Sequence, residues 1–232
     1  MKVSRPLFAA LLLLSLAFHP TTLHAQVTIS TPPALRQIGM LTNAANSTYG
    51  QTLFTPNGIN SLDSFSFQLN AHGNPQTYNP NLQFKAYVMG WDAVNVHATG
   101  PVLWKSDTKI GPGFYNFVTG GVLVAPNQNI VLFLSTTELI DQMRDKTYGL
   151  LMGYGFDDYR DGTWINSYYG GTFAELSTVP WYNNDGCYNC DAAFTATFSN
   201  NQSLITPEPS TCILLACGLG MFYLMSRRKS NA

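Results

Sequence analysis

Short stretches in which apolar and polar residues alternate restrict the fold of this chain more than any other feature. Residues 62–70 read LDSFSFQLN, with an apolar residue at every second position from Phe65 onward. A period of two places the apolar side chains on one face of an extended strand and the polar side chains on the other. Residues 82–91 and 194–198 repeat the pattern, whereas residues 130–134 are apolar throughout. The first three stretches therefore predict half-buried strands, and the last predicts a central strand buried on both faces.

Turn-forming residues separate these stretches at short intervals. Gly, Pro, Asn and Asp supply the backbone angles of tight turns. Clusters of them lie at residues 56–58, 73–75, 111–113, 125–127 and 161–162. Further short strands are predicted at residues 52–54, 102–104, 114–118, 121–124, 150–154 and 163–168. One or two helical turns fit residues 137–146. This succession of strands and turns, without a long amphipathic helix, predicts an all-β domain with a jelly-roll-like β-sandwich fold.

The N-terminal segment has the composition of a secretory signal peptide. Two basic residues, Lys2 and Arg5, precede a mostly apolar run over residues 7–18, and a small residue, Ala25, closes the segment. The run is too short to span a membrane comfortably, and a small residue at this distance is typical of a cleavage site. We therefore expect a signal helix that is removed on export, so that the mature chain begins at Gln26. A buried core helix is the alternative interpretation of the run.

The C-terminal segment, residues 207–232, has three parts: a Pro-Glu-Pro motif, an uncharged and mostly apolar stretch, and a basic cluster. These are Pro207, Glu208 and Pro209; residues 212–225; and Arg227, Arg228 and Lys229. As a helix the apolar stretch rises about 21 Å, less than the hydrocarbon core of about 30 Å, so its flanks must help it to span. Basic residues stay on the cytoplasmic side, which leaves the preceding domain outside the membrane. The β-sandwich of residues 26–206 is thus expected between a signal helix and a C-terminal transmembrane helix.

These three parts, in this order at the end of the chain, resemble the PEP-CTERM sorting signal of Gram-negative bacteria. The resemblance implies recognition by exosortase, a membrane-embedded processing enzyme, with removal of the tail and release or transfer of the domain before it. It also implies a surface or extracellular location, usually in bacteria that make extracellular polysaccharide. An anchor that is never cut is the alternative. Residues 62–135 similarly resemble other PEP-CTERM ectodomains, which favours a β-sandwich and implies no activity.

The charge of the central domain excludes several classes of partner. Without the five basic residues and the one acidic residue of the two ends, totals of 12 and 13 fall to 7 and 12, a net charge of −5 for residues 26–206. Nucleic acids and anionic membrane surfaces require concentrated positive charge, so neither is an expected ligand. The membrane is expected to be contacted only through the C-terminal helix before processing.

Catalytic motifs are absent from the sequence. It contains no Gly-x-Ser-x-Gly elbow, no His-Glu-x-x-His motif and no phosphate-binding loop. We therefore expect a non-catalytic exported protein of the extracellular polysaccharide matrix, with a structural or carbohydrate-binding role. A secreted carbohydrate-active enzyme is the alternative, because the paired carboxylates of glycoside hydrolysis are placed by the fold and not by sequence spacing.

Two cysteines remain in the central domain, Cys187 and Cys190. In an oxidising compartment an isolated pair of this spacing is expected to form a disulfide that fixes a loop. Free or redox-active thiols are one alternative. A metal site is another, but it would need two more ligands, and the histidines His72 and His97 are distant in sequence.

Three carboxylates cluster in the segment GFDDYRDG, namely Asp157, Asp158 and Asp161. Oxygen ligands of this kind bind calcium, although the spacing does not match an EF-hand loop. The alternative is a solvated hairpin loop, because Asp-Gly is itself a turn signal and Arg160 can neutralise a neighbouring carboxylate.

Aromatic residues are dense between residues 154 and 188. Exposed rings on a β-sandwich can stack against the apolar faces of sugars, and Trp164, Trp181 and Tyr182 are the first candidates for such a platform. Packing of these rings in the core is the alternative.

Overall fold

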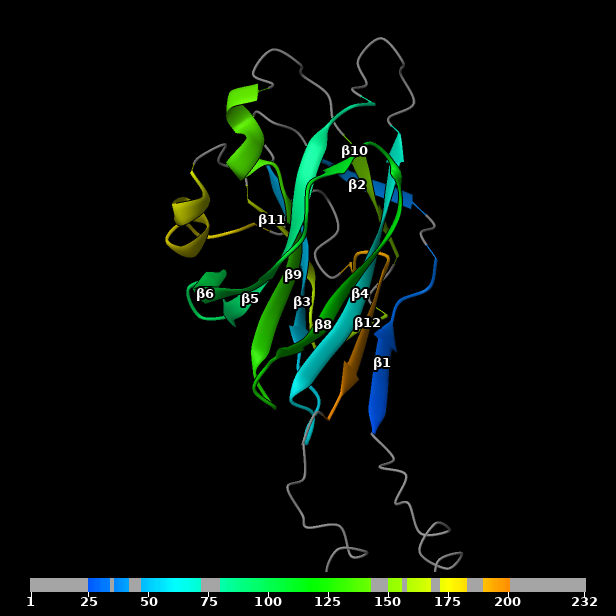
Figure 1. The fold of residues 1–232 in the computed structure, drawn as a ribbon, viewed down its shortest axis with the longest axis vertical. Helices are drawn as coiled ribbons and strands as arrows, with labels where there is room; N and C mark the ends of the chain where they lie inside the picture. The colour runs from blue at the N-terminus through cyan, green and yellow to red at the C-terminus, as the bar shows by residue number, and fades with distance from the viewer. Residues whose placement is uncertain are drawn as a thin grey trace, which may run out of the picture. The chain divides into compact units, whose positions relative to one another are not determined.

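The computed structural model describes residues 25–33, 36–41, 47–71, 80–142, 150–155, 158–167, 172–182 and 190–200. Residues 24–201 form one compact unit. Within the described ranges the chain forms twelve strands and two short 3₁₀ helices (Figure 1). These are β1 (Gln26–Ser30), β2 (Arg36–Leu41), β3 (Thr48–Phe54), β4 (Ser61–Ala71), β5 (Gln83–Asp92), β6 (His97–Lys105), β7 (Lys109–Ile110), β8 (Gly113–Leu123), β9 (Asn129–Ser135), η1 (Thr137–Gln142), β10 (Leu150–Tyr154), β11 (Trp164–Ser167), η2 (Phe173–Ser177) and β12 (Phe194–Ser199).

The strands form two antiparallel sheets, which confirms the predicted all-β sandwich. Sheet A has the order β1-β12-β4-β10-β2, with β8 paired to β4, and sheet B has the order β11-β3-β9-β5-β6, with β7 paired to β5. From β8 onward each successive strand lies in the opposite sheet. In Figure 1, β8 in green, β4 in cyan, β12 in orange and β1 in blue form one continuous part of sheet A.

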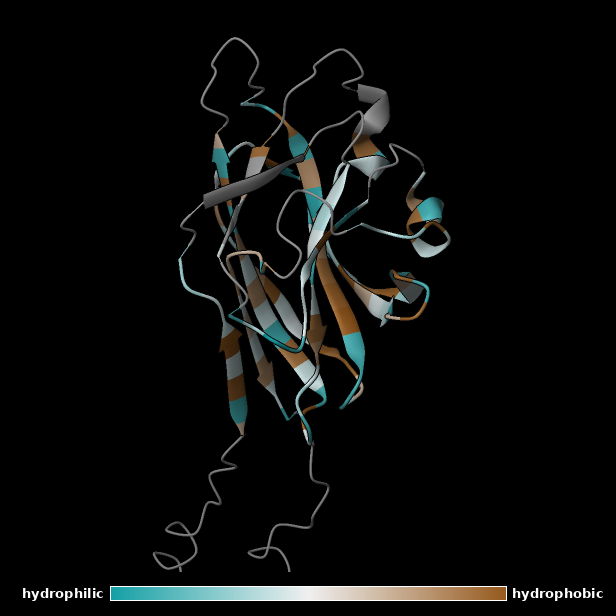
Figure 2. Cartoon of the chain, turned by 180° about the vertical axis from the view of Figure 1, so that it is seen from behind, coloured by the Kyte–Doolittle hydropathy of each residue, from teal (hydrophilic) through white to brown (hydrophobic). Residues whose placement is uncertain are grey.

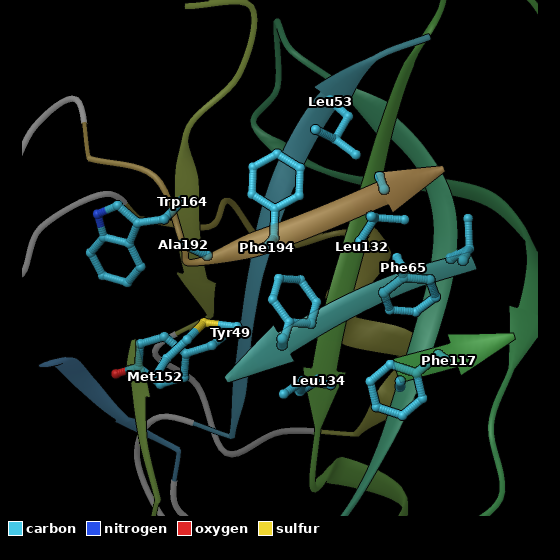
Figure 3. Close-up of a cluster of buried hydrophobic side chains, with 14 of the residues drawn as sticks. Tyr49, Leu53, Phe65, Phe117, Leu132, Leu134, Met152, Trp164, Ala192 and Phe194 are labelled. Atoms are coloured by element: carbon cyan, nitrogen blue, oxygen red, sulfur yellow. The ribbon is translucent and has the colours of Figure 1, made fainter. Parts of the chain in front are cut away.

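The core lies between the two sheets and follows the alternation of the sequence. Phe65, Phe67 and Leu69 of β4 are buried, as predicted. Figure 3 shows rings from sheet A, including Phe65, directed into the same interior as Leu132 and Leu134 of sheet B. Alternating apolar and polar bands are also visible along β1, the strand at the lower left of Figure 2. The polar residues of sheet A are consequently left on its outer face.

Strand β9 is central in sheet B and buried on both faces, as its uninterrupted apolar sequence predicted. Leu132 belongs to the main core, whereas Phe133 belongs to a second apolar cluster on the other side of the sheet. Residues 172–182, which include η2, contribute Leu176 and Trp181 to this second cluster. Sheet B is therefore covered on its outer side by a segment of the chain.

The structure differs from the predicted elements in two ways. Residues 114–118 and 121–124 belong almost entirely to one strand, β8, because the glycines Gly120 and Gly121 lie at a register shift within the strand and not in a turn. Strands β1, β2 and β7 and helix η2 were not predicted, since each is too short for a clear periodicity. Helix η1 lies within the segment predicted to form helical turns, and residues 143–146 of that segment lie outside the described residues.

Both predicted targeting segments, apart from Ala25, lie outside the described residues. Among the residues that the structure does describe, none forms a helix long and apolar enough to cross a membrane.

Candidate functional site

The outer face of sheet A presents an array of small uncharged polar side chains, here called the polar face. On each of the strands β1, β12, β4 and β8, the residues that alternate with the core residues contribute to it. The polar face consists of Thr28, Ser30, Ser64, Gln68, Asn116, Thr195 and Thr197, together with the apolar residues Phe114 and Val118 of β8. Ser66 lies on the same side of β4 but is buried, so its hydroxyl is not part of this surface.

Strand register aligns these side chains in rows across the sheet. One row contains Thr28, Thr197, Ser64 and Val118, and the next contains Ser30, Thr195 and Asn116, with the buried Ser66 between the last two. Within the first row the hydroxyl oxygens of Thr28 and Thr197 lie 3.4 Å apart. Hydroxyl and amide groups both donate and accept hydrogen bonds, so the array offers both kinds of partner to a ligand.

Charge is almost absent from the four strands that form the polar face. Their one charged residue is Asp63, which lies in β4 between residues at which the register shifts. Its carboxylate accepts hydrogen bonds from the hydroxyls of Ser61 and Ser199, at 3.2 and 2.8 Å. The polar face therefore provides hydrogen bonds without ionic attraction, which suits a neutral, hydroxyl-rich ligand.

Phe114 supplies an exposed aromatic ring at one side of the polar face. It is 70% exposed, and its cross-strand partner on β4 is Gln68. The neighbouring residues Tyr115 and Phe117 point the other way, into the core, where their rings stack with centroids 6.0 Å apart. An exposed ring beside an amide side chain is a combination that can stack on the apolar face of a sugar and bond its hydroxyls.

Two of the three aromatic residues predicted to form a sugar platform are buried, so that prediction is wrong for them. Trp164 is fully buried and stacks on Tyr49, with ring centroids 5.8 Å apart (Figure 3). Trp181 is buried in the second apolar cluster, where its indole N–H donates to the carbonyl of Leu176 at 2.9 Å. Burial of a large aromatic ring among apolar groups is more favourable than its exposure to water, so these two rings pack in the core.

Tyr182, the third predicted platform residue, is half-buried. Its backbone pairs with that of Asn166 through two hydrogen bonds of 2.7 and 2.9 Å. The three candidates therefore do not form a common exposed surface.

Phe114 was overlooked at the sequence level, although the apolar residues on both faces of FYNFV were a signal that one set must be exposed.

The predicted calcium ligands lie in a loop between β10 and β11. Asp158 and Asp161 are exposed, and Asp157 lies outside the described residues. Among the described residues, no group of three or more His, Cys, Asp or Glu side chains is close enough to hold a metal ion. A calcium site that includes Asp157 stays a prediction.

A buried carboxylate, Asp191, holds this loop in place, although no sequence motif points to it. One of its oxygens accepts from the side-chain amide of Gln51 at 2.7 Å. The other accepts from the backbone N–H groups of Asp158 and Tyr159, at 3.0 and 2.7 Å. The Gln51 carbonyl in turn accepts from the Ala192 N–H at 2.8 Å. This network attaches the loop to sheet B and has a structural role.

Cys190 is disulfide-bonded and fully buried next to this network. Cys187, its predicted partner, lies outside the described residues, so the pairing stays a prediction. Of the two histidines considered as metal ligands, His97 places its Nδ1 2.8 Å from the carbonyl oxygen of Ala98, and His72 lies outside the described residues.

Glu138 of η1 forms the ion pairs of the described structure, away from the polar face. It contacts Lys85 at 2.8 Å and Lys105 at 3.3 Å. Partial burial raises the pKa of Glu138, but the hydrogen bond and charge of Lys85, helped by Lys105, outweigh it and hold that pKa below its usual value. Burial raises the pKa of Tyr87, and the nearby Glu138 carboxylate raises it further. These contacts fasten η1 to β5 and β6.

The fold and the polar face define an all-β sandwich with an uncharged, hydrogen-bonding surface. No protein-family model matches the chain, and a search of curated proteins finds no match. Two solved structures are distantly similar. One is the clostridial cysteine protease Cwp84 after propeptide cleavage, with a TM-score of 0.46 and 11% identity over 75% of this chain and 40% of that one. The other contains the cysteine protease and lectin-like domains of Cwp84, a surface layer associated protein of Clostridium difficile. Its TM-score is 0.42, with 9% identity over 71% of this chain and 36% of that one.

Proposed function

We propose that this chain is an exported, non-catalytic matrix protein whose polar face binds neutral extracellular polysaccharide. The observation that supports this proposal best is the combination of rows of hydroxyl and amide groups, one exposed ring at Phe114, and the lack of charge. The hydroxyl groups of a sugar can donate hydrogen bonds to such groups and accept hydrogen bonds from them. The apolar face of a pyranose ring can stack on an aromatic ring. The alternation of strands between the sheets also supports the jelly-roll-like form of the sandwich.

The lack of charge also argues against glycoside hydrolysis at the polar face. That reaction requires two carboxyl groups on either side of the scissile bond, one as acid and one as base or nucleophile. The outward side chains of the polar face include no carboxylate, and Asp63 is engaged with Ser61 and Ser199. Binding without chemistry is therefore the function that this surface supports.

Export is supported by the position of the first strand. Strand β1 begins at Gln26, the expected first residue of the mature chain, and it pairs with β12 along its whole length. Removal of residues 1–25 would consequently leave sheet A complete. Gln26 lies opposite Ser199, so the expected new N-terminus and the start of the connection to the anchor lie at the same end of the domain.

Processing can be tested by the intact mass of the protein from its native host, with and without active exosortase. We expect the strain with active enzyme to yield a chain without its first 25 residues and without the tail that follows the Pro207 motif. The strain without the enzyme should keep the tail. The same mass in both strains would contradict processing by exosortase and indicate a permanent membrane anchor.

Polysaccharide binding can be tested by affinity electrophoresis in gels that contain the neutral fraction of the host's extracellular polysaccharide. We expect this polymer to retard the chain and Phe114→Ala to weaken binding about tenfold, as loss of one stacked ring predicts. Val94→Ala is the matched control, because Val94 is exposed in a turn of sheet B and should bind normally. Equal retardation of wild type and Phe114→Ala would contradict the assignment of the polar face.

A further inference from the structure

The edges of the two sheets differ in how they are protected from pairing with other strands. An edge strand exposes unpaired N–H and C=O groups, and natural proteins block such edges with proline, lysine or short strands. Strand β6, at one edge of sheet B, contains Pro101 and Lys105. Strand β11 at the other edge has four residues, and β1 at an edge of sheet A has five.

Strand β8 has none of these protections. It pairs with β4 on one side, and no other strand in the described ranges pairs with it. It has 11 residues and contains neither proline nor a charged side chain. Phe114 and Val118 on its outward side are 70% and 71% exposed. A long, uncharged and partly apolar edge of this kind is suited to pairing with a further strand.

The sequence of β8 is complementary to itself in one register. Its regular part runs from Gly113 to Val118 and is paired to β4 without a shift; the shift follows near Gly120 and Gly121. If two β8 strands pair antiparallel about a two-fold axis at Asn116, each Phe114 lies opposite Val118 of the other copy. The same register places Tyr115 opposite Phe117. Pairs of aromatic and β-branched or aromatic residues stabilise antiparallel strands, and no like charges meet.

We propose that two copies of this chain form a symmetric dimer by antiparallel pairing of their β8 strands, centred on Asn116. The self-complementary register selects a second copy over an unrelated strand. Pairing joins sheet A of both copies into one continuous sheet, so the two polar faces lie side by side. The dimer does not depend on polysaccharide binding, although two linked faces would bind a repeating polymer more tightly than one.

Single cysteines in the full-length chain test the register. Cys212 and Cys217 are replaced by serine in every variant, and this background without an added cysteine is the control. In the proposed dimer the two copies of Asn116→Cys lie directly opposite, about 5 Å apart between Cα atoms, within reach of a disulfide. Two copies of Phe114→Cys lie about 14 Å apart, beyond such reach.

After mild oxidation, we expect Asn116→Cys to give a covalent dimer on a non-reducing gel and Phe114→Cys alone to give none. A mixture of Phe114→Cys with a larger tagged Val118→Cys chain should give the mixed dimer. Adding Val118→Lys to Asn116→Cys should reduce the yield at least tenfold, whereas adding Val94→Lys should not change it. Absence of the Asn116→Cys dimer, or equal crosslinking by Phe114→Cys alone, would overturn the proposal.

Discussion

Replacement of Asp191 by alanine is expected to lower the free energy of unfolding by about 3–5 kcal/mol. The change removes the acceptor of three hydrogen bonds, from Gln51 and from the backbone N–H groups of Asp158 and Tyr159. Gln51 is fully buried, so its amide cannot exchange this partner for water. The loss is measured by urea denaturation followed by circular dichroism. Asp191→Asn should lower the free energy of unfolding by less than Asp191→Ala, because asparagine keeps one side-chain oxygen that can accept a hydrogen bond.

The matched control for this prediction is Asp161→Ala, which removes an exposed carboxylate from the same loop. Surface substitutions of this kind usually change stability by less than about 0.5 kcal/mol. If Asp191→Ala lost no more stability than Asp161→Ala, the hydrogen bonds to Asp191 would not hold the loop, and the account of this network would be incorrect.

Replacement of Trp164 by alanine is expected to cost about 3–5 kcal/mol, the usual range for a buried tryptophan. The change empties the volume of the largest fully buried side chain and removes the stacked contact with Tyr49. Denaturation is followed by circular dichroism, because the substitution also alters tryptophan fluorescence. Trp164→Phe should lower the free energy of unfolding by less than Trp164→Ala, since it keeps an aromatic ring beside Tyr49.

Phe54→Ala provides the comparison for Trp164, because Phe54 lies on the neighbouring strand β3 and is 39% exposed. We expect a much smaller loss of stability for this variant. A stable Trp164→Ala protein with weakened polysaccharide binding would contradict the core position of this ring. Such a result would instead support Trp164 as an exposed residue that stacks on sugars.

Most of the sandwich could be predicted from the sequence because its long strands alternate clearly. In β4 the alternating residues Phe65, Phe67 and Leu69 are buried as predicted, and β9 was correctly predicted to be central because both of its faces are apolar. Strand pairing could not be predicted, since it depends on contacts between distant segments. The pairing of β1 with β12 joins the first and last strands, and no local pattern indicates it.

The candidate site was predicted less well than the fold. The sequence shows that aromatic residues are numerous, but it does not show which rings face outward. Trp164 and Trp181 were therefore predicted for the sugar platform in place of Phe114. The polar face also requires the strand order, because its rows combine residues from four separate strands. The buried role of Asp191 depends on hydrogen bonds from Gln51, 140 positions away, and from Asp158 and Tyr159, more than 30 positions away, which no short motif encodes.

The central claim is that polysaccharide binds on the polar face beside Phe114, and hydroxyl-radical footprinting tests it most directly. The chain is oxidised alone and when saturated with the neutral polysaccharide fraction, and side-chain modification is quantified by mass spectrometry. We predict that oxidation of Phe114 falls at least threefold while that of Phe54, on sheet B, stays unchanged. Unchanged oxidation of Phe114 in the saturated chain, or protection confined to Phe54, would contradict the claim.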